Sequence, residues 1–178
     1  MTTDPPDSRA PRASRPHMPG YGLPEGTEGL MPWQWAEQRL TASHNYWLAT
    51  TRPDGRPHLM IVWGLWLDGR FYFSTGRHSR KARNLEQNAH CVLATEQAEQ
   101  AAVVEGVAEE ITDVALLKTL LSSYQRKYDY DMSSMEAAIL NLQEPIYAIR
   151  PTVAFGLDEA SANWAAPRLP TLVRPMFF

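Results

Sequence analysis

The residues best suited to binding chemistry form a basic run that begins at Arg77. No acidic residue occurs between residues 70 and 85, although the whole chain has a net charge of −3. Ser79 is a favourable N-cap, which places Arg80 and Lys81 in the first turn of a helix. The helix dipole disfavours cations at that end, and a bound phosphate would reverse the sign of that interaction. The pattern therefore indicates either an anion site or a solvated basic helix face.

The other reactive side chains show no pattern of a hydrolase or a metal site. No metal-binding spacing connects the five histidines, which are His17, His44, His58, His78 and His90. Cys91 lies in an apolar segment, where a thiol is inert. Glu109 and Glu110 are neighbours on an expected strand, so they point to opposite faces and cannot work as an acid and base pair. We therefore predict no metal and assign no catalytic residue; the candidate proton sources are Tyr124, Tyr128, His58 and water.

Composition narrows the class of protein. The chain has 178 residues, of which 44% are hydrophobic and 21% charged, as in one ordinary globular domain. Its longest apolar run, residues 59–67, is far shorter than the roughly 20 residues that a membrane span needs. The net negative charge gives no general attraction to nucleic acid or to anionic lipid. A single cysteine fits a reducing compartment, so we expect a cytoplasmic protein with neither nucleic acid nor a membrane as partner.

Short strands and a few helices must position the basic run. Strands are expected at residues 46–51, 58–67, 70–75, 91–95, 101–111, 145–150 and 152–157. Helices are expected at residues 32–38, 79–88 and 114–128. The strands follow one another by tight turns, without the alternating helices of a parallel sheet. This order predicts an antiparallel barrel or sandwich.

The expected strand at residues 58–67 is apolar on both faces. A strand with one face in solvent would alternate with polar residues, so its outward face should be covered by a helix or by a partner subunit. A homodimer is the simplest cover.

The two ends of the chain differ from its middle. Residues 1–29 contain six prolines and four glycines with few large apolar side chains, so we expect a disordered tail without a signal peptide. Residues 30–158 form the expected barrel domain. Residues 159–178 lack a period yet include six large aliphatic or aromatic side chains between Leu169 and Phe178. We expect this apolar tail to pack on the barrel or on a partner.

Three stretches of the sequence carry a resemblance to a known family. They read WLATTRPDGRPHLMIVWGLWLDGRFYF, FYFSTGRHSRKARNLEQNAHCVL and VVEGVAEEITD. Over residues 45–113 the chain resembles the FMN-binding split barrel of the pyridoxamine 5′-phosphate oxidase family. It is similar in particular to actinobacterial relatives that use FMN or the deazaflavin coenzyme F420. The resemblance implies a mainly β fold with added helices, a split antiparallel barrel and a homodimer.

The resemblance also implies a cofactor site. Arg80 and Lys81 would hold the cofactor phosphate, with hydroxyl donors from Thr75 and Ser79. Asn84, one helical turn after Arg80, would point at the same phosphate. The flat ring would lie along the backbone of one strand, at Met60, Ile61, Val62 and Trp63. For Trp63 and Trp66, a place in the barrel core is the alternative.

Departures from the family pattern shape the functional hypothesis. In the oxidases proper, a Gln and an Arg reach the cofactor across the dimer, whereas this chain has Ala101 and Val103 there. The C-terminal tail also lacks the segment that grips the substrate phosphate. We therefore expect a flavin- or deazaflavin-dependent reductase that passes hydride to a bulky, largely apolar conjugated acceptor, and not a pyridoxamine phosphate oxidase. Arg126 or Lys127 would meet an acidic cofactor tail, or remain solvated.

An alternative is a protein of the same fold that binds flavin, F420 or haem without turnover. In a haem protein, His58 would be the iron ligand. The sequence does not distinguish FMN from coenzyme F420 as the cofactor, and it favours either of them over haem.

Overall fold

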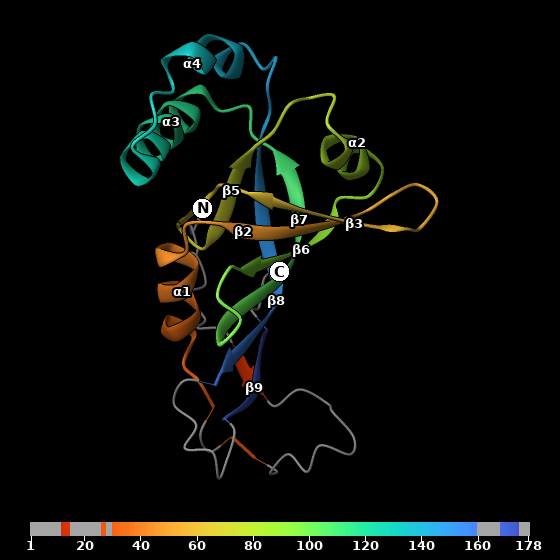
Figure 1. The fold of residues 1–178 in the computed structure, drawn as a ribbon, viewed down its shortest axis with the longest axis vertical. Coiled ribbons are helices and arrows are strands. Elements are labelled where there is room, and N and C mark those ends of the chain that lie inside the picture. The colour runs from red at the N-terminus through yellow and green to blue at the C-terminus, as the bar shows by residue number, and fades with distance from the viewer. Residues whose placement is uncertain (1–11, 15–25, 28–29, 160–167, 175–178) are drawn as a thin grey trace, which may run out of the picture.

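The computed structural model describes residues 12–14, 26–27, 30–159 and 168–174 (Figure 1). Within these residues nine strands belong to one sheet, accompanied by four helices. The strands are β1 (Arg12–Ser14), β2 (Tyr46–Thr51), β3 (Pro57–Val62), β4 (Leu65–Leu67), β5 (Arg70–Ser74), β6 (His90–Thr95), β7 (Gln100–Glu110), β8 (Ile146–Asp158) and β9 (Arg168–Arg174). The helices are α1 (Trp33–Ala42), α2 (Arg80–Gln87), α3 (Val114–Tyr128) and α4 (Ser133–Leu140).

The sheet curls into a barrel with one open seam. Its strands run in the order β1-β9-β8-β7-β6-β2-β3, and β5 pairs with both β8 and β4. Every pairing is antiparallel, as the sequence predicted. The chain passes from β3 to β4 through residues 63 and 64, yet these two strands do not pair within the described residues. The seam between β3 and β4 is therefore the split of a split barrel.

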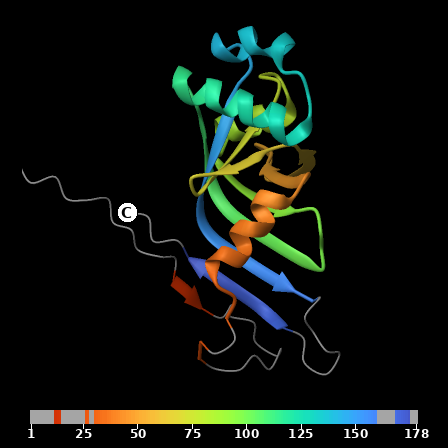
Figure 2. The same cartoon turned by 90° about the vertical axis from the view of Figure 1, so that its left-hand side faces the viewer.

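Two clusters of buried side chains stabilise the fold. The first fills the barrel, where the rings of Tyr46 and Phe73 both contact Phe71, with centroids 4.5 and 6.3 Å from its own. The second lies under α3 and α4 and includes Leu117 and Ile139. Figure 2 shows these two helices together at one end of the barrel. None of the helices in the described part of the chain has the length and apolarity to cross a membrane.

The structure corrects the expected strand at residues 58–67. It contains two strands, β3 and β4, with a corner between them. A Cβ atom at Gly64 would lie 2.7 Å from the carbonyl oxygen of Tyr72 and would also overlap the ring of Phe71. Only glycine allows this close approach, and the strand is interrupted there. An uninterrupted apolar run gave no sign of the corner.

The expected strands at residues 145–150 and 152–157 are one strand in the structure. β8 continues through Pro151, which lies opposite Gly106 of β7. The register shifts between Glu105 and Gly106, and such a bulge accommodates a proline that cannot donate to the ladder. Helix α4 was not expected, because its eight residues carry no N-cap hydrogen bond and only a short apolar pattern.

The two expected tails meet in the structure. Residues 12–14, inside the segment expected to be disordered, form β1 and pair with β9. β9 pairs in turn with β8, so part of the C-terminal tail extends the barrel sheet. The predictions for the rest of residues 1–29 and 159–178 mostly concern residues outside the described ones.

Candidate functional site

The start of α2 forms as the sequence predicted. β5 ends at Ser74, and a short turn leads to Ser79, whose Oγ accepts a hydrogen bond from the backbone N–H of Ala82 at 3.2 Å. The Oγ atoms of Ser79 and Thr75 lie 3.0 Å apart. The two predicted hydroxyl donors are therefore neighbours at the helix N-terminus, which is the electropositive end of the helix.

The basic run divides into paired and unpaired cations. Arg77 donates to a carboxylate oxygen of Glu110 at 2.6 Å and to the carbonyl oxygens of Leu142 and Gln143. Within the described residues, neither Arg80 nor Lys81 has an ion pair or a side-chain hydrogen bond. Lys81 is half-buried, and burial lowers its pKa. Arg77 is thus a structural clamp, whereas Arg80 and Lys81 retain binding capacity for an anion.

The first half of β3 lies close to these cations. Burial lowers the pKa of His58, and the positive charges of Arg52, Lys81 and Arg80 lower it further. The Nδ1 atom of His58 is 3.4 Å from the Oγ1 atom of Thr50 on the paired strand β2. The positive end of α2 and the beginning of β3 therefore face one another.

Asn84 has a different environment from the one the sequence suggested. We expected its side chain at the phosphate, but it is completely buried and its Nδ2 donates to Thr50 Oγ1 at 2.9 Å. Its Oδ1 has no partner among the described residues. The observed bond anchors α2 to β2 and so fixes the helix beside the seam.

The second half of β3 presents a free edge. β3 pairs with β2 alone, so its other edge is not hydrogen-bonded to any described strand. Met60 and Ile61 are about half exposed, and Val62 is buried. Unpaired backbone N–H and C=O groups along such an edge can bind a polar planar ring. This is the segment whose backbone was predicted to line the cofactor ring.

A cavity of about 250 Å³ lies where β3 ends. It brings together two predicted cofactor residues, Trp63 and Thr75, and the candidate proton source Tyr124 with residues that the sequence did not single out. Its lining comprises Trp63, Ser74, Thr75, Gly76, Tyr124, Tyr130, Met132 and Met135. The unexpected members come from the α3–α4 hairpin, which no motif in the sequence connects with residues 60–81.

Three side chains on one face of α3 hold the corner between β3 and β4. Tyr124 donates to the carbonyl oxygens of Trp63 and Tyr72, at 3.2 and 3.0 Å. The Tyr128 hydroxyl accepts from the N–H of Gly64 at 2.7 Å, and its proton is shared between the carbonyl oxygens of Gly64 and His44, each at 2.9 Å. Lys127 Nζ donates to the carbonyl oxygen of Gly64 at 2.9 Å. The spacing of 124, 127 and 128 places all three on one side of the helix.

These contacts change the pKa values or occupy the hydrogen-bonding groups of the candidate proton sources on α3 and of the cations considered for an acidic cofactor tail. Burial raises the pKa of Tyr124 strongly and that of Tyr128 to about 12, so both keep their protons at neutral pH. Burial lowers the pKa of Lys127 to about 8, and its ammonium points inward to Tyr46. Arg126 is exposed and bonds to Ser123. The two tyrosine hydroxyls are engaged with the backbone.

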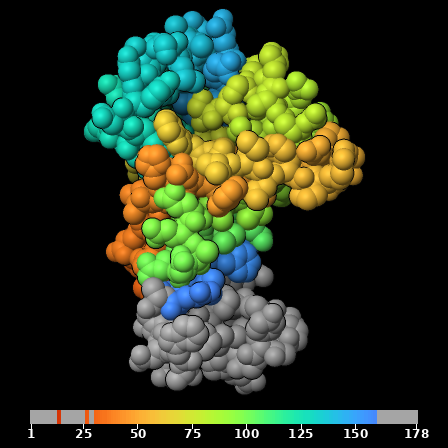
Figure 3. All heavy atoms as spheres, in the orientation of Figure 1, coloured from red at the N-terminus to blue at the C-terminus, as the bar shows by residue number. Residues whose placement is uncertain are grey.

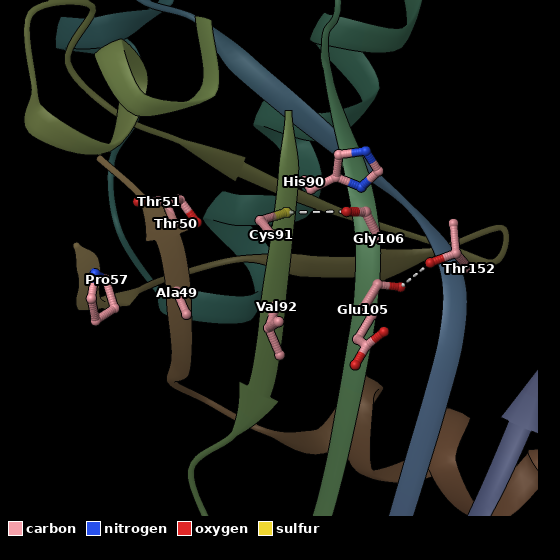
Figure 4. A pocket seen from close by; sticks show the side chains of 10 residues that line it. All are labelled: Ala49, Thr50, Thr51, Pro57, His90, Cys91, Val92, Glu105, Gly106 and Thr152. Atoms are coloured by element: carbon pink, nitrogen blue, oxygen red, sulfur yellow. Dashed lines mark hydrogen bonds between the residues drawn. The ribbon is translucent and has the colours of Figure 1, made fainter. Parts of the chain in front are cut away.

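A second cavity of about 250 Å³ lies over β2, β6, β7 and β8 (Figure 4). None of the predicted site residues lines it. Cys91 lies there with its Sγ 3.8 Å from the carbonyl oxygen of Gly106, and burial raises the pKa of the thiol to about 12. The thiol therefore stays protonated and inert at neutral pH, as its apolar surroundings predicted.

Comparison with known proteins shows the family to which the chain belongs. Residues 34–151 match the family described as pyridoxamine 5′-phosphate oxidase. The chain belongs to this family. The matched segment begins in α1 and ends in β8, so it includes β3, α2 and the α3–α4 hairpin. Among curated proteins, no sequence matches at a significant level.

Solved structures share the split-barrel fold of the pyridoxamine 5′-phosphate oxidase family. A conserved hypothetical protein from Mycobacterium tuberculosis is 23% identical with a TM-score of 0.63, covering 74% of this chain and 88% of that one. An F420 reductase is 24% identical with a TM-score of 0.53, covering 74% and 98%. A haem storage protein from Vibrio cholerae is 17% identical with a TM-score of 0.52, covering 67% and 87%. At these identities the likeness concerns the fold.

Proposed function

We propose that the protein is an oxidoreductase that binds FMN or the deazaflavin coenzyme F420 in the seam between β3 and β4. One observation carries the proposal: two cations at the start of α2, without partners among the described residues, lie close to His58 at the beginning of β3, a strand with one unpaired edge. The family and the F420 reductase among the structural neighbours point to the same class. The bound ring would supply hydride, which no protein side chain provides.

The residues present fit a phosphate at the start of α2. Ser79 accepts hydrogen bonds from the backbone N–H groups of Ala82 and Arg83. The backbone N–H groups of Arg80 and Lys81 have no partner among the described residues. A phosphate there would accept from these amides and from the two side chains, with Thr75 and Ser79 as hydroxyl donors. It would also neutralise the half-buried ammonium of Lys81, whose lowered pKa reflects an environment without a counter-charge.

The chain itself would position the ring and keep water away. The backbone edge of residues 60–63 would lie along the ring, and Trp63 with the α3–α4 hairpin would wall off one end. The acceptor is expected to be apolar and conjugated, because methionine and aromatic side chains dominate the neighbouring cavity. Water or His58 would supply the proton, because the hydroxyls of Tyr124 and Tyr128 donate to backbone carbonyls.

We also propose that the protein acts as a homodimer. Residues on one face of β3, β2 and β6 are apolar and exposed within the single chain, with Leu59 at 55% and Ile61 at 50%. Trp47 lies opposite Ile61, and Val92 follows in the next strand, so the exposed groups form one patch. Figure 3 shows the surface that β2, β3 and β6 form. Light scattering on wild type and Ile61→Glu tests this: we expect a dimer that the charge converts to monomer.

The second candidate function is binding without turnover. The observation that favours it is that Tyr124 and Tyr128, the two tyrosines considered as proton sources, are engaged with the backbone and cannot act as free acids. In a haem protein His58 would be the ligand, and its lowered pKa would keep the imidazole neutral and able to bind iron. A haem storage protein occurs among the structural neighbours.

A cofactor titration tests the proposal. The protein is purified from a host that makes FMN, its visible spectrum is recorded, and FMN, coenzyme F420 and haem are titrated in turn. We expect FMN or F420 to bind, and the double variant Arg80→Ala, Lys81→Ala to bind at least about tenfold more weakly. Arg83→Ala removes an exposed cation from the same helix and serves as the control. Tight haem binding that His58→Ala abolishes would favour the second candidate, and unchanged affinity in the double variant would contradict the phosphate site.

A further inference from the structure

Trp63 has an unusual combination of order and exposure. One face of its indole stacks on Tyr128, with centroids 4.5 Å apart and an interplanar angle of 8°. Tyr130 and His44 approach it with nearly perpendicular rings, at 5.8 and 5.9 Å. The residue is nevertheless 42% exposed. A large aromatic ring with one packed face and substantial exposure retains surface for a further ring.

The backbone of this residue is held as firmly as its ring. Tyr124 bonds to the carbonyl oxygen of Trp63, and Tyr128 and Lys127 bond to that of Gly64. The same Tyr128 therefore supports the indole and fixes the corner that carries it. Binding to a group held in this way loses little conformational freedom, which favours affinity.

The cavity beside Trp63 has the composition of a site for a flat apolar molecule. Tyr130, Met132 and Met135 from the α3–α4 connection and α4 line it with the indole, and in the part of the chain that the structure describes no charged side chain does. Methionine sulfur makes favourable contacts with aromatic rings. The volume of about 250 Å³ is smaller than the roughly 300 to 1,000 Å³ of common small-molecule pockets. A compact ring fits this space better than a bulky one.

The cavity also lies next to the proposed cofactor position. Thr75 lines it, and Thr75 Oγ1 is 3.0 Å from the Ser79 Oγ that caps α2. Trp63, which directly follows β3, is the last residue of the segment 60–63 along which the cofactor ring is proposed to lie. A molecule in the cavity would therefore be in reach of a ring whose phosphate is held at α2, as transfer between the two requires.

We propose that the exposed indole of Trp63 is the stacking platform for the hydride acceptor, a compact planar conjugated molecule of one or two fused rings. This inference rests on the proposed function and narrows its substrate class from bulky acceptors to compact planar ones. Met132, Met135 and Tyr130 line the same subsite.

A matched pair of ligands tests the platform by binding alone. The aromatic 2-naphthol and its saturated counterpart decahydro-2-naphthol share a carbon skeleton and a hydroxyl group, and only the first is planar. We titrate both into the full chain by calorimetry, with and without bound FMN, and follow the Trp63 indole N–H signal by NMR, assigned from Trp63→Phe. We expect 2-naphthol to bind more tightly and to shift that signal.

Variants then separate stacking from general apolar burial. We expect Trp63→Leu to weaken 2-naphthol binding about tenfold and to change the affinity for the saturated analogue much less. Trp63→Phe should retain most of the affinity, which also shows that the position tolerates substitution. Equal affinity for the two ligands, or an unshifted Trp63 signal on binding, would overturn the inference.

The cofactor and acceptor roles of the cavity are distinguished by the same variants. If Trp63→Leu weakened FMN but left 2-naphthol unaffected, the cavity would hold the cofactor ring and the acceptor platform would be wrong. If 2-naphthol bound at Trp63 but neither FMN nor F420 bound to the protein, the proposed oxidoreductase would fail while the aromatic binding site would stand.

Discussion

Two half-buried lysines, one at each end of the seam, have the same kind of perturbation and opposite surroundings. Burial lowers the pKa of Lys81 at the start of α2 and that of Lys127 near the end of α3. Lys127 donates to Tyr46 Oη at 2.8 Å and to Gly64 O at 2.9 Å, and it lies over the Tyr46 ring at 4.8 Å. Lys81 has no such partner among the described residues.

The difference separates a structural cation, Lys127, from Lys81, which we propose binds a ligand. A buried ammonium is costly unless hydrogen bonds or a counter-charge compensate it. At Lys127 the fold supplies that compensation from its own carbonyl and hydroxyl groups, so the lysine holds the corner of the barrel. At Lys81 the fold leaves the compensation to a ligand, which we propose is the cofactor phosphate. The two lysines have the same charge and similar burial, so only their hydrogen-bond partners distinguish them.

The largest effect is expected at the corner that Lys127 holds. Gly64→Ala would overlap the ring of Phe71 and the carbonyl oxygen of Tyr72, so the free energy of unfolding should fall by about 3 kcal/mol. Gly76→Ala, near α2, is the matched control, because its Cβ would meet only Glu144 Oε2 at 3.7 Å. Urea unfolding measures both. Similar losses in the two variants would mean that the corner is no tighter than the turn before α2.

The next effect concerns cofactor affinity at Lys81. Lys81→Met keeps the aliphatic part of the side chain and removes its charge, so FMN should bind about tenfold more weakly. Arg83→Met removes an exposed cation from the same helix and should leave the dissociation constant within about twofold. Fluorescence titration of FMN gives both constants. Equal losses of FMN affinity in the two variants would mean that Lys81 contributes only general electrostatic attraction and no direct contact with the phosphate.

A smaller effect is expected on stability without any ligand. Lys127→Met removes hydrogen bonds to Tyr46 and Gly64 and should lower the free energy of unfolding by about 1 to 2 kcal/mol. Lys81→Met removes no bond and relieves the burial of a charge, so the apoprotein should be unchanged or slightly more stable. Urea unfolding without cofactor compares them. A greater loss at position 81 than at position 127 would reverse the assigned roles.

The last effect is the contribution of Lys127 to the pH dependence of stability. Its pKa is about 8 in the folded protein, against an ordinary value of 10.5. Between these values the unfolded chain holds a proton that the folded chain has lost, so the free energy of unfolding should rise with pH. In Lys127→Met this part of the rise should be missing between about pH 8 and 10.5. Identical pH slopes in wild type and variant would show that the lysine does not titrate in that range.

The chain's local patterns predicted its local structure well. Ser79 was recognised as a cap and does cap α2, and the helix at 114–128 has those limits in the structure. Both depend on neighbours within a few residues, which the sequence displays directly. The break at Gly64 and the continuous β8 were missed, because each depends on a contact with a distant strand: Tyr72 in one case and Gly106 in the other.

The candidate site was predicted at the start of α2 and along residues 60–63, but not at the α3–α4 hairpin. Thr75, Ser79, Arg80 and Lys81 come from one short segment and carry a motif, so they could be named together. The α3–α4 hairpin entered the site without any motif. Its Tyr130, Met132 and Met135 are ordinary apolar residues in the sequence and become cavity walls only when the second core cluster places them over Trp63.

The sequence by itself determined the antiparallel β class, the family and the position of the basic helix start, because these depend on residue order and short-range hydrogen bonding. Tertiary structure decided which cations are free. Arg77 is satisfied by Glu110, 33 residues away, and Lys127 by Gly64, 63 residues away, whereas Arg80 and Lys81 meet no such partner among the described residues. Whether a charge is compensated depends on groups brought within about 3 Å by folding, and linear spacing carries no record of that distance.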